Sequence, residues 1–180
     1  MCYVSCSLAA YSKFPGNFSP IKNWLSDLGD IYQNPTGAIF YNIGILFTGT
    51  LVLSFFLSIS RWQMRNRRIQ NSLVLATQVF GVLGSIALIL SAIFPINLPQ
   101  EHRIASIALY TLLGTAFAFS VTALRYQPVC PKAMLAIGAI TAFFDILSGI
   151  LHEVTVLEWL TVALFLTYLV LLSRFTRRLE

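Results

Sequence analysis

Four polar side chains at helical spacing form a chemically promising stripe within an otherwise apolar stretch of the chain. Thr141, Asp145, Ser148 and His152 recur at intervals of three and four residues within 132–158. On a helix they therefore lie within about 60° of one another. A carboxylate in the middle of a membrane segment costs about 2.5–3.5 kcal/mol on insertion scales. We therefore expect Asp145 to face other helices or water, and Asp145 and His152 to form an acid–base or ligand pair.

Two glycines share this stripe. Gly138 and Gly149 stand on the same side of the helix as Asp145 and Ser148. A face that only packed helices together would carry alanine or leucine, so the glycines predict room for a cavity. Ser148 would then contact a bound substrate. The structural alternative for Asp145 is a hydrogen bond to a Thr or Ser of a neighbouring helix, which would only fix the packing.

A second polar line begins at His102. His102, Ser106 and Tyr110 repeat at i+4 on one helical face. The positive end of the helix dipole near His102 favours its neutral ring, and a neutral imidazole beside a carboxylate can act as a general base or bind a metal. We predict His102 as a second base or ligand and Tyr110 as a substrate contact.

The remaining candidates lie on segments that we expect at the same end of the molecule. Ser26, Asp27 and Glu153 are predicted to contact the substrate at the rim of the site. Glu101 and Glu158, like Glu153 itself, have the simpler interpretation of solvated rim charges.

Several kinds of chemistry lack their signatures. The chain contains no HExxH, P-loop or GxSxG motif. Its two histidines fall short of a three-histidine zinc site, although a His/Asp/Glu set remains open, so the sequence names no metal and no cofactor. Nucleic acid is disfavoured as a partner because the arginines flank apolar segments without a recognisable binding fold.

The composition is that of an integral membrane protein. Of the 180 residues, 57% are hydrophobic and only 11% are charged, whereas soluble domains carry about 25% charge. No composition shift divides the chain, so we predict a single membrane domain over 1–180. The predicted fold class is all-α, a polytopic transmembrane helix bundle.

Prolines and arginines delimit the expected helices. Residues 1–11 form a short apolar segment, and Ser19–Gly29 has the caps and spacing of a short amphipathic helix in the membrane interface. In that helix Trp24 and Leu28 should be buried and Lys22 should face solvent. Five long spans are expected at about 34–60, 72–94, 99–125, 132–153 and 155–173.

Basic residues alternate with the spans. The clusters at 61–68, 125–132 and 174–178 all fall on one side of the predicted bundle. By the positive-inside tendency this side is cytoplasmic. We therefore predict a multi-pass protein of the cell membrane with a cytoplasmic C-terminus and the candidate site at the outer side.

Short motifs carry a family resemblance. Pro15-Gly16, Leu25 to Gly29, Asn34-Pro35, Asn42 to Gly44, Phe94-Pro95, His102 and Gly149 to Glu153 occur in this order. In these motifs the chain resembles the domain of unknown function (DUF) family 998, small polytopic membrane proteins of prokaryotes distantly similar to Frag1/DRAM/Sfk1. The resemblance implies the topology and no particular activity.

Three functions fit these observations. The first is binding or processing of a lipid, in the manner of a hydrolase or transferase, in a polar cavity open to the outer leaflet. The second is a small proton- or cation-coupled transporter that uses Asp145. The third is a structural subunit without its own chemistry. Membrane lipids are the expected partners, with a second copy of the chain or another membrane protein as a further one.

Overall fold

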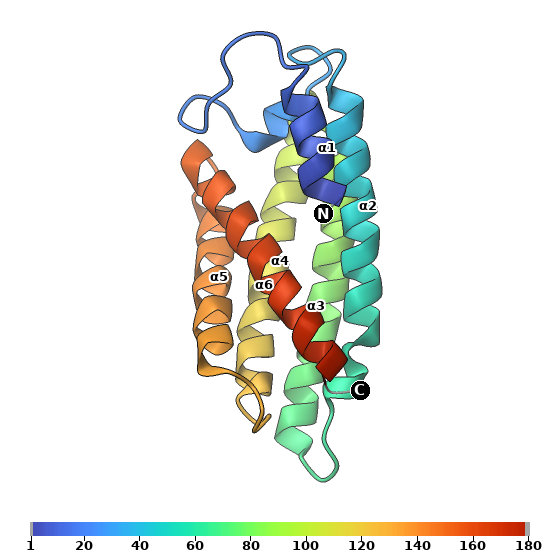
Figure 1. Ribbon diagram of the computed structural model, residues 1–180, viewed down its shortest axis with the longest axis vertical. Coiled ribbons are helices and arrows are strands. Elements are labelled where there is room, and N and C mark those ends of the chain that lie inside the picture. The colour runs from blue at the N-terminus through green and yellow to red at the C-terminus, as the bar shows by residue number, and fades with distance from the viewer. Residues whose placement is uncertain (1, 179–180) are drawn as a thin grey trace.

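The computed structural model describes residues 2–178, and Met1, the first residue of the predicted short segment, lies outside them. The described residues form an all-helical bundle without strands (Figure 1). Its elements are α1 (Cys2–Tyr11), the 3-10 helix η1 (Leu25–Gly29), α2 (Ala38–Ser58), the 3-10 helix η2 (Ile59–Trp62), α3 (Arg68–Ile93), α4 (Pro99–Leu124), α5 (Lys132–Ile150) and α6 (Thr155–Arg178).

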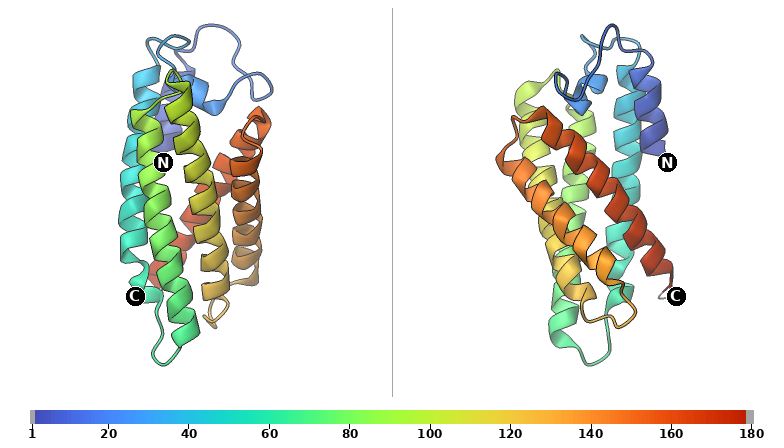
Figure 2. Two further views of the ribbon diagram at one scale, coloured as in Figure 1. Left: turned by 180° about the vertical axis from the view of Figure 1, so that it is seen from behind. Right: turned by 60° about the vertical axis from the view of Figure 1, so that its left-hand side comes forward.

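Five of these helices are long and apolar enough to cross a membrane, as predicted: α2 extended by η2, α3, α4, α5 and α6. Helices that follow one another in sequence pack together, and α6 crosses the bundle obliquely (Figures 1 and 2). The short α1 packs on the upper part of α2, where Gly44 lets the Cys6 side chain approach the backbone. The prediction of a polytopic helical bundle is confirmed.

The basic clusters gather at one end of the bundle. The α2–α3 and α4–α5 connections and the end of α6 all lie at the lower end in Figure 1. The opposite, upper end carries the segment 12–37, the α3–α4 connection and the α5–α6 connection. The assignment of the lower end to the cytoplasm stays a prediction.

The expected amphipathic helix is shorter than predicted. Only Leu25–Gly29 is helical, and Ile21, expected on the buried face, is 79% exposed. Asp27 causes the interruption, because its carboxylate accepts the backbone N–H of Trp24 at 3.0 Å and Trp24 is extended. Lys22 is exposed and Leu28 buried, as expected, while Trp24 is half-buried.

The 3-10 helix is also a buried element of the bundle, not a helix on its surface. All five residues of Leu25–Gly29 are buried, and they contact α1, α2 and α6. Asn34, fully buried, donates side-chain hydrogen bonds to the carbonyls of Ala10 and Leu28 at 3.1 and 3.0 Å. This amide ties the polar segment 12–37 to the upper end of the helices.

Aromatic rings pack between α4 and α6. Phe117 lies 5.1 Å from Tyr168 and 5.9 Å from Phe165, measured between ring centroids. The Tyr168 hydroxyl bonds to that of Ser120 at 2.9 Å, and both residues are fully buried. The bundle is thus packed tightly below Asp145.

The argument that glycines leave room for a cavity is wrong. A side chain at Gly138 would collide with the ring of Tyr168, and one at Gly149 would meet Thr111. Both glycines therefore let a neighbouring side chain or helix approach the α5 backbone.

Candidate functional site

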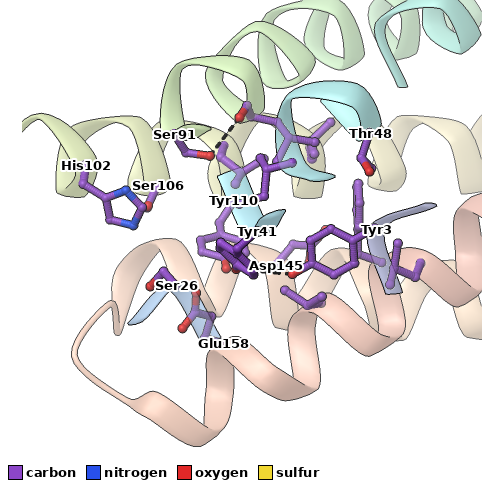
Figure 3. A pocket seen from close by; sticks show the side chains of 17 residues that line it. Tyr3, Ser26, Tyr41, Thr48, Ser91, His102, Ser106, Tyr110, Asp145 and Glu158 are labelled. Carbon is purple, nitrogen blue, oxygen red and sulfur yellow. Dashed lines mark hydrogen bonds between the residues drawn. The ribbon is translucent and has the colours of Figure 1, made fainter. Parts of the chain in front are cut away.

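A narrow cavity of about 60 Å³ occupies the upper half of the bundle, which we call the inner cavity (Figure 3). It is lined by residues of all six α-helices and of η1. Its polar and tyrosine lining consists of Tyr3, Ser26, Tyr41, Thr48, Ser91, His102, Ser106, Tyr110, Asp145 and Glu158.

A wider cavity of about 250 Å³, the outer cavity, lies at the upper end of the bundle. It is bounded by η1, the start of α4 and the α5–α6 connection. The two cavities have a common set of lining residues, namely Ser26, His102, Ser106, Tyr110 and Glu158. They therefore meet at these side chains.

Asp145 is the most unusual residue of the site. It is 1% exposed and lines the inner cavity, and neither of its carboxylate oxygens has a hydrogen-bond partner among the described residues. Its Cβ lies against the position where Gly114 has no side chain, so α4 and α5 approach closely behind it. The expectation that Asp145 faces the interior is met, whereas the alternative, a packing bond to a Thr or Ser of a neighbouring helix, is not seen among the described residues.

Glu158 lies in the first turn of α6 and lines both cavities. Its Oε2 accepts the backbone N–H of Leu25 at 2.8 Å, and Ser26 also donates to the carboxylate. The prediction of a solvated rim charge is wrong for this residue. The spacing of residues in α6 could have indicated that Glu158 faces the interior. It shares one face of the helix with Thr161, Val162 and Phe165.

His102 is fixed by the end of α3. Its Nδ1 lies 2.8 Å from the carbonyl oxygen of Phe94. Because a carbonyl only accepts, Nδ1 carries the proton, and in the neutral ring Nε2 is left as an acceptor. In the view of Figure 3, His102, Ser26 and Glu158 lie on one side of the cavity and Tyr3 on the other, with Asp145 between them.

The candidates at the end of α5 and in the α5–α6 connection line the outer cavity only. Ser148 is buried, and its hydroxyl bonds to that of Thr161 at 2.6 Å. His152 lies 3.7 Å from Glu153 through Nε2, and the Glu153 side chain is 82% exposed. Asp145 and His152, predicted as a pair, thus line different cavities, whereas His102 lines both.

Asp27 lines neither cavity. Its carboxylate accepts from the side chain of Asn23 at 3.3 Å and from Trp24 N–H, which stabilises η1. Burial raises the pKa of Asp27 above its ordinary value, against these two hydrogen bonds, which lower it. Asp27 therefore supports the position of its neighbour Ser26, which lines both cavities.

Two tyrosines of the inner cavity were not among the predicted residues. Tyr3 on α1 and Tyr41 on α2 lie with their hydroxyl oxygens 3.3 Å apart and their ring centroids 6.0 Å apart. Their meeting depends on the packing of α1 on α2, which no local spacing reveals. Among the described residues no group of three or more His, Cys, Asp or Glu could hold a metal ion.

One protein family matches almost the whole chain. The family described as Protein of unknown function (DUF998) matches residues 1–174. The chain belongs to this family. No curated protein and no solved structure matches it. Membership in the DUF998 family agrees with the multi-pass helical architecture and assigns no activity.

Proposed function

We propose that this DUF998 protein binds a lipid, or another amphiphile, with the polar head in the joined cavities. The observation that carries the proposal is Asp145, a buried carboxyl group that borders the inner cavity and has no hydrogen-bond partner among the described residues. An unpartnered buried charge is unfavourable by several kcal/mol or more. A ligand that donates hydrogen bonds to Asp145 would remove this cost, which favours binding of such a ligand in the inner cavity.

The distribution of side chains around the cavities suits an amphiphile. Polar groups concentrate where the cavities meet, at Ser26, His102 and Glu158. The deeper wall between α2 and α6 is apolar and consists of Ile45, Val162, Phe165 and Leu166. A head group would occupy the polar part and an acyl chain would follow the apolar wall toward the surrounding lipid.

Processing of the bound lipid is the finer form of the same proposal. His102 is the candidate base, because Nε2 of its neutral ring is an acceptor and the residue lines both cavities. Asp145 would bind the head group from the inner cavity. His152 would serve as an acid, base or ligand from the outer cavity. Ser26 and Tyr110, which line both cavities, supply hydroxyls that orient the substrate.

The other two functions receive less support. A transporter needs a path below Asp145, but Tyr168 covers Gly138, and the Thr141 hydroxyl bonds to the carbonyl of Ile137 on its own helix. A purely structural subunit would use Asp145 to join two helices, and Asp145 makes no such bond among the described residues.

Native mass spectrometry of the purified protein tests the binding proposal. Ser106 lines both cavities, so Ser106→Phe should fill their junction and remove a co-purifying lipid that the wild-type protein retains. Ser54→Phe is the matched control, since Ser54 is exposed on α2 away from both cavities. Equal lipid retention by both variants, each eluting as a folded protein, would contradict the proposal.

A further inference from the structure

We propose that the inner cavity selects amphiphiles whose head group is an ammonium ion, that is, a protonated or quaternary amine. This inference rests on the proposed lipid-binding function and adds the chemical class of the ligand. It comes from the hydrogen-bonding character of the cavity and from the aromatic rings that surround it.

The ionisable side chains that line the inner cavity offer hydrogen-bond acceptors. Asp145 offers two free carboxylate oxygens. Glu158 offers a second carboxylate, which the backbone of η1 holds in place. His102 adds Nε2 as an acceptor when its ring is neutral, because Nδ1 then carries the proton that faces the Phe94 carbonyl. A ligand that complements these three groups must donate hydrogen bonds or carry positive charge.

An anionic head group does not fit this environment. No lysine or arginine is among the described residues that line the inner cavity, and Arg103 borders only the outer one. A phosphate or carboxylate placed there would meet two carboxylates without a compensating side-chain cation, which is strongly unfavourable in a buried site. We therefore expect the inner cavity to disfavour an anionic head group and to favour an ammonium ion.

Aromatic rings strengthen the preference. Tyr3, Tyr41, Tyr110 and Phe165 come from four different helices and line the same cavity as Asp145 (Figure 3). Rings attract cations through their negative faces, and cages of several rings recognise ammonium groups. A neutral alcohol gains no such attraction, so charge and not only hydrogen bonding should separate the two ligand classes.

The test compares oleylamine with oleyl alcohol, which have the same chain and differ in the head group. An alkyl amine is protonated at pH 7, as the lysine side chain is. Each probe is titrated into the protein in neutral dodecyl maltoside micelles, and thermal unfolding is followed by the fluorescence of its three tryptophans. Oleylamine should raise the unfolding midpoint well above the value reached with oleyl alcohol.

Variants locate the effect. Asp145→Asn should weaken oleylamine binding about tenfold or more and leave oleyl alcohol binding nearly unchanged. Glu158→Gln provides a second variant, because its amide carbonyl can still accept from Leu25 while the charge is lost. Glu101→Gln, an exposed residue outside both cavities, makes the same chemical change at the same end of the bundle and should have no effect.

The outcomes separate this inference from the function on which it rests. Equal stabilisation of the wild-type protein by amine and alcohol would overturn ammonium selectivity and leave lipid binding in place. An amine effect that survives in both Asp145→Asn and Glu158→Gln would place the amine elsewhere and would also overturn it. The absence of any response, together with the absence of a co-purifying lipid in native mass spectrometry, would overturn both proposals.

Discussion

Glu158 on α6 accepts the backbone N–H of Leu25 on η1 at 2.8 Å, joining residues 133 positions apart in the chain. This bond fixes the 3-10 helix above the point where the two cavities meet. One carboxylate thus holds the upper segment in place and also contributes an acceptor to the site.

Substitution of Glu158 should separate these two roles. Glu158→Ala leaves the Leu25 N–H without its partner and should lower the free energy of unfolding by about 1–3 kcal/mol. Glu158→Gln keeps an acceptor and should lose less. The exposed Glu101→Ala serves as the control and should stay within about 0.5 kcal/mol of wild type. Chemical denaturation measures the stability of all three variants. Equal stability of Glu158→Ala and Glu158→Gln would show that the bond to the Leu25 N–H does not stabilise the fold.

Asp145→Asn should not destabilise the ligand-free protein. Asp145 makes no hydrogen bond among the described residues, and the near-isosteric amide removes a buried charge, so the unfolding midpoint should stay equal or rise. Ser148→Ala, one turn away on α5, loses the 2.6 Å bond to Thr161 and should cost about 1 kcal/mol. A thermal scan in which Asp145→Asn is the less stable of the two would show that Asp145 has a packing role.

Gly138, on the same face of α5 as Asp145, should not accept a larger side chain. Gly138→Val would push against Tyr168, whose hydroxyl is held by Ser120, and should cost about 1–3 kcal/mol or more. Ala136→Val adds two methyl groups at an exposed position of the same helix and should be nearly neutral. Similar denaturation midpoints for the two variants would mean that α5 and α6 pack less closely than described.

The orientation in the membrane can be read by cysteine labelling in a variant without the native cysteines. Arg65 and Tyr32 are exposed at opposite ends of the bundle. If the basic end is cytoplasmic, a membrane-impermeant maleimide added to intact cells should modify Tyr32→Cys and not Arg65→Cys. The reverse pattern would invert the topology and move the cavities to the cytoplasmic leaflet.

Local sequence signals account for most of the fold. Prolines at 95, 99 and 131 and the arginine clusters delimit helices that the structure reproduces within a few residues. The first of these prolines lies just beyond α3 and the second begins α4, where a missing N–H is tolerated. The 3-10 helix is shorter than expected because the Asp27 side chain accepts the Trp24 N–H. The spacing of apolar residues does not predict this hydrogen bond.

The candidate site was predictable only in part. The cost of a buried carboxylate predicts that Asp145 faces inward, and the structure agrees. The prediction that Gly138 leaves room for a cavity failed because a glycine can border either a void or a large neighbouring side chain. Here the neighbour is Tyr168. Tyr41 and Glu158 join the site through long-range packing of α1 and η1, which depends on the whole bundle and not on residue spacing.

The most direct test of lipid-head binding is an electron density map of the protein crystallised with its native lipids retained. We expect a head group in the joined cavities, with a polar atom of the ligand within hydrogen-bond distance of Asp145, and density for an acyl chain along the apolar wall between α2 and α6. Density for lipid only on the outer surface of the bundle, with water alone beside Asp145, would contradict the account.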